Sequence, residues 1–200
     1  MLFRSDQGFA NTVLAQQVFG GHGYIAEHGM EQFVRDARIT MLYEGANGIQ
    51  ALDLVGRKLP KDGGRALQAF FGEVSAYIKE HGEPAMAPYV IPLNQALGEL
   101  QQATMWFLQN ALDNPDNAGA GATDYMHLFG LVALGYMWCR IAEAATSKTA
   151  AGGNGGTDRM AQRLATGRFF MERILPAATA HLARIKAGAA STMALSADAF

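Results

Sequence analysis

The chain has 200 residues, of which 50% are hydrophobic and only 17% are charged. Because the usual charged fraction is about 25%, we infer extra buried surface, in an oligomer or against further sequence. The net charge of −2, without any block of Lys and Arg, excludes a nucleic-acid footprint.

Apolar residues recur at helical spacing along almost the whole chain, and no segment alternates with period two. The first half of the pattern predicts a helix over residues 5–18 that stops at Gly20 and Gly21, a glycine-rich loop over 19–29 and a helix over 30–39. The Glu44 segment then interrupts the pattern. Asn47 is expected to be the N-cap of a further helix that Pro60 closes.

The second half, from Lys61 onward, predicts four longer helices that pack as a bundle. The expected helices cover residues 65–80, 93–112, 125–148 and 160–185, the last with a kink at Pro176, and the expected connections cover 81–92, 113–124 and 152–158. The small and polar residues 187–200 predict a partly mobile tail. The fold class is therefore all-α, with three parts: 1–60, 61–188 and 189–200.

The longest uncharged apolar stretch, residues 125–139, is shorter than the roughly 20 residues that span a bilayer. We therefore expect a buried core helix and no membrane association. The one cysteine, Cys139, lies inside this stretch and is expected to be a small core residue. A single cysteine, and the absence of a signal peptide before Arg4 and Asp6, fit a cytoplasmic location.

Two polar groups in the first sixty residues have an ordinary structural interpretation. His22 and His28 flank the glycine-rich turn, but their spacing matches no metal motif, so we predict packing or hydrogen bonding and no metal site. Arg35 and Arg38, in the segment RDAR, fit a surface ion-pair cluster.

Glu44, in MLYEGANGIQ, is a single carboxylate with apolar residues before it and a glycine after it. A poorly solvated carboxylate has a raised pKa and is a better base near neutral pH. Read alone, the residue is either such a base or an ordinary loop acid. The glycines of FGGHG permit close backbone approach to an anionic cofactor tail, although they form neither a P-loop nor a Rossmann turn.

Three segments, QQVFGGHGY, VRDARIT and YEGANGIQ, in this order and this close together, resemble the C-terminal helical domain of acyl-CoA dehydrogenases. The resemblance covers about the first sixty residues. The remainder is similar in character, and in its closing MALSADAF, to the extra helical domain of a longer branch of the family, which includes 3-methylmercaptopropionyl-CoA dehydrogenases.

The resemblance implies a role for each matching position. Gln17, Val18, Phe19, Gly20 and Gly21 match the segment that contacts the FAD of the dimer partner, Glu44 matches the catalytic base, Gly45 lies against the substrate, and Ala46, Asn47 and Gly48 fall at FAD contacts. Ala46 replaces a common Thr and Gly48 a common Glu or Gln, so the cofactor contacts there depend on the backbone.

The implied reaction is the α,β-dehydrogenation of an acyl-CoA, with FAD as cofactor and electron-transfer flavoprotein as acceptor, in a homodimer or larger oligomer. The family's N-terminal helical domain and flavin-binding β-domain are not among these 200 residues. We therefore expect a C-terminal fragment that is inactive alone. The alternative is a non-catalytic helical module for dimerisation or interaction that retains the motif. The motifs do not separate a dehydrogenase from a related acyl-CoA oxidase, because the flavin pocket that sets oxygen reactivity is not among these residues.

Overall fold

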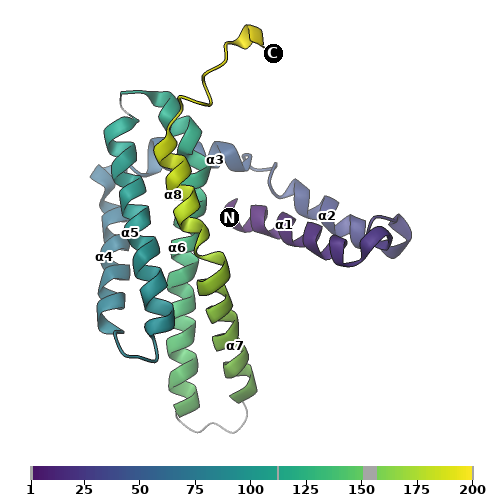
Figure 1. Cartoon of the computed structure of the whole chain (residues 1–200), viewed down its shortest axis with the longest axis vertical. Helices are drawn as coiled ribbons and strands as arrows, with labels where there is room; N and C mark the ends of the chain where they lie inside the picture. Colours follow the sequence, from purple (N-terminus) through teal and green to yellow (C-terminus); the bar gives the residue numbers. More distant parts are fainter. Residues whose placement is uncertain (1, 112, 151–156, 200) are drawn as a thin grey trace.

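The computed structural model describes residues 2–111, 113–150 and 157–199, which form an all-helical structure with no strand among them. A helical hairpin projects from the side of an elongated helical bundle (Figure 1). The expected all-α class is therefore confirmed for the described part of the chain.

The hairpin consists of α1 (Leu2–Val18) and α2 (Met30–Ile39), joined by two short 3₁₀ turns, Gly20–Gly23 and Ala26–His28. Gly29 ends the second turn with φ 72°, a left-handed conformation that glycine adopts without a steric penalty. The hairpin contains no buried hydrophobic side chain among those described, since the buried set begins at Ala51. The hairpin therefore has no core of its own.

A short third helix connects the hairpin to the bundle. Helix α3 (Asn47–Asp53) continues into a π-helical segment, Leu54–Lys58, that ends just before Pro60. Ala51 and Val55 are buried and belong to the hydrophobic core of the bundle, and α3 packs against α6. The residues expected to close the first part of the chain thus pack into the core of the second.

The bundle contains α4 (Arg65–Glu80), α5 (Ala87–Asn110), α6 (Pro115–Ala150) and a last helix formed by α7 (Thr157–Phe169), a π-helical segment (Phe170–Ile174) and α8 (Ala177–Ala187). Pro176 interrupts this last helix as expected, because it lacks the N–H that would continue the ladder. Full burial of an aliphatic side chain stabilises a fold by about 2 kcal/mol. The fully buried aliphatic core includes Val74, Leu93, Leu100, Leu128, Val132 and Ile185.

Two expected connections were placed wrongly. Helix α6 begins at Pro115, ten residues before the prediction, and α5 begins at Ala87, with Pro88 in its first turn. Proline is tolerated in the first turn of a helix, where its missing N–H has no intrahelical partner. Asn114 accepts a hydrogen bond from the Asp116 N–H at 3.1 Å, which caps the new start of α6. Of the expected break at 152–158, residues 152–156 lie outside the described residues, whereas Thr157 and Asp158 begin α7.

Helix α6 has the length and apolar composition of a membrane-crossing helix. In this structure its apolar side chains pack instead against α5, α7 and α8, and Tyr125, Leu128 and Cys139 are fully buried. The expected core helix is confirmed. The tail from Gly188 to Ala199 extends away from the end of the bundle (Figure 1), with a final 3₁₀ turn at Ala197–Ala199.

Candidate functional site

The segment between α2 and α3 is a tight loop with Glu44 at its turn. Glu44 has φ 55° and Gly45 has φ 87°, so two consecutive residues adopt left-handed conformations. Such a conformation is uncommon for a residue with a side chain, whereas glycine adopts it freely. A Cβ atom at Gly45 would collide with the side-chain amide of Gln50, which donates to the Glu44 carbonyl at 3.2 Å.

The carboxylate of Glu44 is exposed in this chain, and so are its neighbours Leu42 and Tyr43, which are 48% and 52% accessible. The dry setting that the sequence suggested is therefore not formed by these residues alone. The expectation failed because adjacent apolar residues exclude water only when other elements cover them, and the described chain covers Leu42 and Tyr43 only about half.

The loop is closed at Asn47. The Asn47 N–H donates to the Met41 carbonyl at 3.1 Å, and the Asn47 side-chain amide contacts Ser5 and Asp6 on α1. The predicted N-cap role is wrong, because the N-cap position is Ala46 and it carries no capping side chain. Asn47 is instead the first helical residue, and its side chain ties the loop to α1.

The glycine-rich segment lies at the other end of the hairpin. Val18 and Phe19 are 86% and 54% exposed, Gln17 and Gly21 are also exposed, and Gly20 has φ 60°. The structure does not bring these residues to Glu44, because the whole length of α1 separates the tip of the hairpin from its base (Figure 1). A 17-residue helix is about 25 Å long.

The two histidines and the two arginines have structural contacts within the hairpin. His22 and His28 meet edge to face, with ring centroids 5.0 Å apart, which confirms a packing role. Arg35 forms an ion pair with Glu31 at 2.9 Å. Arg38 lies over the ring of Phe9, 5.7 Å from its centroid, and thereby joins α2 to α1.

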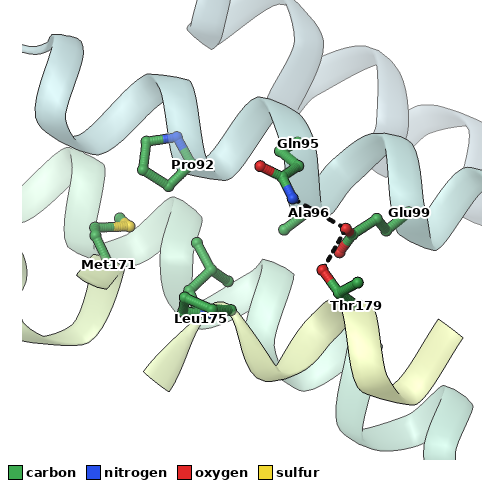
Figure 2. A pocket seen from close by; sticks show the side chains of 8 residues that line it. Pro92, Gln95, Ala96, Glu99, Met171, Leu175 and Thr179 are labelled. Carbon is green, nitrogen blue, oxygen red and sulfur yellow. Dashed lines mark hydrogen bonds between the residues drawn. The ribbon is translucent and has the colours of Figure 1, made fainter. Parts of the chain in front are cut away.

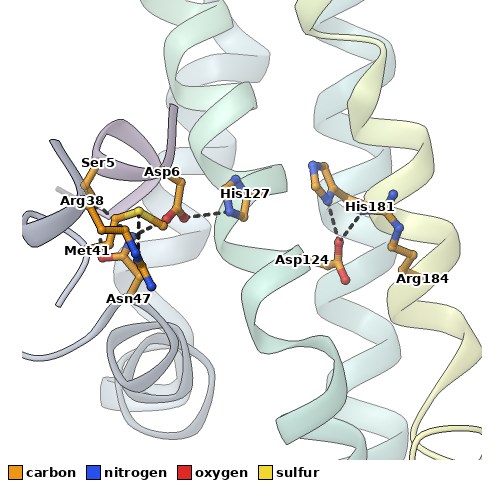
Figure 3. A network of polar contacts seen from close by, with 9 residues as sticks. All are labelled: Ser5, Asp6, Arg38, Met41, Asn47, Asp124, His127, His181 and Arg184. Carbon is orange, nitrogen blue, oxygen red and sulfur yellow. Dashed lines mark hydrogen bonds and ion pairs between the residues drawn. The ribbon is translucent and has the colours of Figure 1, made fainter. Parts of the chain in front are cut away.

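A polar network that the sequence did not indicate connects the base of the hairpin to the bundle (Figure 3). Asp6 of α1 pairs with His127 of α6 at 3.0 Å, and His181 of α8 pairs with Asp124 at 2.7 Å. Burial lowers the pKa of His127, against the opposing effect of Asp6. Single charged residues at distant positions gave no sequence signal that they would meet.

A small cavity inside the bundle contains a second unexpected group, Glu99. The cavity has a volume of about 70 Å³ and is lined by Pro92, inside α5, and by Pro176, just before α8 (Figure 2). Glu99 is only 8% exposed and accepts hydrogen bonds from Gln95 at 3.1 Å and Thr179 at 2.7 Å. These contacts tie α5 to α8, and the cavity lies in a different part of the chain from the Glu44 loop.

Comparison with known proteins assigns both parts of the chain. Residues 4–59 match the family described as "Acyl-CoA dehydrogenase, C-terminal domain", and residues 70–196 match the one described as "Acetyl-CoA dehydrogenase C-terminal like". The second match covers more than half of the chain. The chain therefore belongs to the acyl-CoA dehydrogenase family and corresponds to its C-terminal portion.

Individual relatives agree with this assignment. The chain is 34% identical over 187 residues to the 3-methylmercaptopropionyl-CoA dehydrogenase of Ruegeria pomeroyi, a match that covers 92% of this chain and 31% of the relative. It is 26% identical to the broad-specificity linear acyl-CoA dehydrogenase FadE5 of Mycobacterium tuberculosis, over 88% of the chain and 30% of that protein. A butyryl-CoA dehydrogenase of Syntrophomonas wolfei is 26% identical over 98% of the chain and 32% of its own length. The chain thus spans about a third of each relative.

Proposed function

We propose that this chain is the C-terminal part of a flavin-dependent acyl-CoA dehydrogenase and carries its catalytic base, Glu44. The observation that carries the proposal is the Glu44 loop, in which two left-handed residues present a carboxylate at the surface beside a glycine. Gly45 beside the carboxylate is exposed, and because the Gln50 amide occupies the position that a Cβ atom would take, a thioester would approach this loop from its solvent side.

The role proposed for Glu44 is the removal of the proton from Cα of an acyl-CoA thioester. In this reaction FAD, when bound, accepts the hydride from Cβ. Glu44 works as a strong base only where water is excluded, so the proposal requires a cover over Leu42 and Tyr43. Exposed backbone N–H groups near the thioester oxygen stabilise a developing enolate.

The tip of the hairpin is suited to one edge of an FAD molecule. Val18 and Phe19 offer exposed apolar surface, and a Cβ placed on Gly20 or Gly21 would meet no atom within 4 Å, so the backbone is open to close approach. The distance of this tip from Glu44 supports the proposal that the two ends serve different FAD molecules of a dimer. The proposed contact by the Asn47 side chain is weakened, since that side chain already contacts α1.

The hairpin also exposes enough apolar surface to dock against further protein. Exposed hydrophobic side chains are found on both helices and on their connection, among them Leu14, Tyr24, Phe33 and Ile39, and Ile49 of α3 is exposed as well. Large contiguous apolar surfaces mark interaction sites. We propose that the flavin-binding portion of the enzyme covers this surface, and that the chain is inactive without it.

The proposed organisation has residues 1–60 as the end of the dehydrogenase's own helical domain, 61–188 as an additional bundle and 189–200 as a tail. The proposed acceptor is electron-transfer flavoprotein, and the proposed assembly is a homodimer or a larger oligomer.

The alternative function, a helical interaction module with Glu44 as a relic, is supported by the same exposed apolar surface. The test combines this chain with the flavin-binding portion of the Ruegeria relative and measures flavin content and acyl-CoA turnover. We expect Glu44→Gln to retain flavin and lose a factor of about 10²–10⁴ in turnover, the usual contribution of a general base.

The matched control for this test is Glu27→Gln, which removes another exposed carboxylate of the hairpin and is expected to leave turnover unchanged. Normal turnover in Glu44→Gln would disprove the base assignment. Failure of the combined protein to bind any flavin would favour the interaction module.

A further inference from the structure

Besides α3, which follows the loop into the bundle, a bridging carboxylate, Asp6, joins the Glu44 loop to the C-terminal bundle (Figure 3). Its Oδ1 atom accepts a hydrogen bond from the Asn47 side-chain amide, and its Oδ2 atom accepts one from His127 Nε2 at 3.0 Å. The side chains of Asp6 and His127 are only 17% and 14% exposed. Hydrogen bonds to a carboxylate are stronger in such a poorly solvated place than at the surface.

The imidazole of His127 is held from its other side by α8. Its ring stacks on that of His181, with centroids 5.4 Å apart and an interplanar angle of 11°. His181 pairs with Asp124 at 2.7 Å, and Arg184 also contacts Asp124, at 3.2 Å. The titratable and charged groups around His127 are therefore Asp6 from α1, Asp124 from its own helix, and His181 and Arg184 from α8. This arrangement fixes the ring that faces Asp6.

Asn47 connects Asp6 to the Glu44 loop by hydrogen bonds. Its backbone N–H holds the Met41 carbonyl at 3.1 Å, so the two ends of the segment 41–47 meet at this residue. Its side-chain amide also donates a hydrogen bond to Ser5 Oγ, at 2.9 Å. A displacement of Asn47 therefore moves both ends of the segment that presents Glu44.

We propose that His127 is a positioning residue, which acts through Asp6 and Asn47 to hold the Glu44 loop in its left-handed turn. The additional bundle then has a direct role in placing the carboxylate and does more than extend the chain. For catalysis this inference rests on the proposed function of Glu44, whereas the mechanical coupling is independent of it.

The experiment measures amide hydrogen exchange in the 200-residue chain and in His127→Leu. The substitution removes the donor to Asp6 and places an apolar side chain against His181. We expect the hydrogen-bonded amides of residues 41–43 and 47 to exchange about tenfold faster, the effect of losing a hydrogen bond to a charged group. Exchange in α4 and α5 is expected to stay unchanged.

Two further variants separate positioning from general weakening. His127→Gln keeps an N–H donor that can reach Asp6, and we expect it to restore the slow exchange of the loop. Tyr89→Phe removes a hydrogen bond of similar length, from the Tyr89 hydroxyl to the Leu164 carbonyl at 2.9 Å, and is expected to leave the loop unaffected. If His127→Leu does not fold, as judged by circular dichroism, Asp6→Ala replaces it with the same expected result.

The inference is overturned if the loop exchanges at its original rate in His127→Leu, or in Asp6→Ala where that variant replaces it. It is also overturned if exchange rises equally in every helix of the bundle.

In the combined flavoprotein we expect His127→Leu to lower kcat about tenfold with KM and flavin content unchanged, and an unchanged kcat would overturn the catalytic part of the inference. Normal turnover in Glu44→Gln would overturn the proposed function while leaving the exchange result intact, so the two failures are distinguishable.

Discussion

A buried hydroxyl pair, Thr104 and Tyr125, joins α5 to α6 and allows a quantitative test of the bundle's energetics. Tyr125 is fully buried, its hydroxyl lies 2.8 Å from Thr104 Oγ1, and Thr104 Oγ1 lies 2.9 Å from the Leu100 carbonyl. The Thr104 hydroxyl has one hydrogen, which it gives to Leu100. Tyr125 must therefore be the donor to Thr104.

This assignment predicts unequal costs for the two single substitutions. Tyr125→Phe removes one hydrogen bond and leaves Thr104 with its acceptor, so it lowers the free energy of unfolding by about 1 kcal/mol. Thr104→Val leaves the Tyr125 hydroxyl buried without an acceptor, which costs about 2 kcal/mol. In the double variant no orphaned hydroxyl remains, and the expected loss is about 1.5 kcal/mol instead of the additive value of about 3 kcal/mol.

The assay is urea unfolding followed by circular dichroism for the four proteins, with equal slopes required before the free energies are compared. The reasoning is refuted if Tyr125→Phe costs more than Thr104→Val, because the hydroxyl of Thr104 would then be the donor to Tyr125. It is also refuted if the two losses add, since additivity would mean that no orphaned group is created.

Three further predictions concern single positions. Burial lowers the pKa of His127 from 6.5, so the unfolded chain binds the proton more tightly and the free energy of unfolding falls as the pH drops below about 6.5. His127→Gln should make this fall smaller. The measurement is urea unfolding at pH 7.5 and pH 5.5, roughly one unit on either side of the ordinary histidine pKa. Burial raises the pKa of the Cys139 thiol to about 12, so a disulfide reagent should label it only after unfolding, and rapid labelling of the native protein would contradict this. At Gly98 a Cβ atom would meet no atom within 4 Å, so Gly98→Ala should raise the free energy of unfolding by about 0.5–1 kcal/mol. At Gly121 a Cβ atom would lie 2.8 Å from Phe107, so Gly121→Ala should lower it by about 1–3 kcal/mol.

The sequence predicted the helices best where apolar periodicity and helix ends agreed. The helices expected over residues 30–39 and 65–80 have the same bounds in the structure. The prediction failed at 113–124, which was expected to be a connection and belongs to α6 from Pro115 onward. Gly121 instead lies inside α6, where it lets the helix approach Phe107 closely. Composition alone does not distinguish a glycine that ends a helix from one that permits close packing.

For the candidate site too, the sequence predicted the local features but not the contacts between distant residues. The position of Glu44 in a loop with a glycine was predictable, because glycine after a lone polar residue is a local signal. The pairing of Asp6 with His127 was not, because it depends on how the start of α1 packs against the middle of α6. The solvent exposure of Glu44 was not predictable either, because the apolar residues beside it exclude water only if other parts of the protein pack on them.

The attachment of the hairpin explains why the bundle matters to the proposed site. A hairpin without buried hydrophobic side chains gains little from its own packing, because the stabilisation from burial scales with the apolar area removed from water. Its orientation in this chain therefore depends on α3 and on the polar contacts of Asp6, which link α1 to both Asn47 and His127. A flavin-binding portion docked on the exposed apolar face would add the missing burial. The bundle and that portion would then hold the Glu44 loop from opposite sides, which is the arrangement that a base needs if it is to be both fixed and dry.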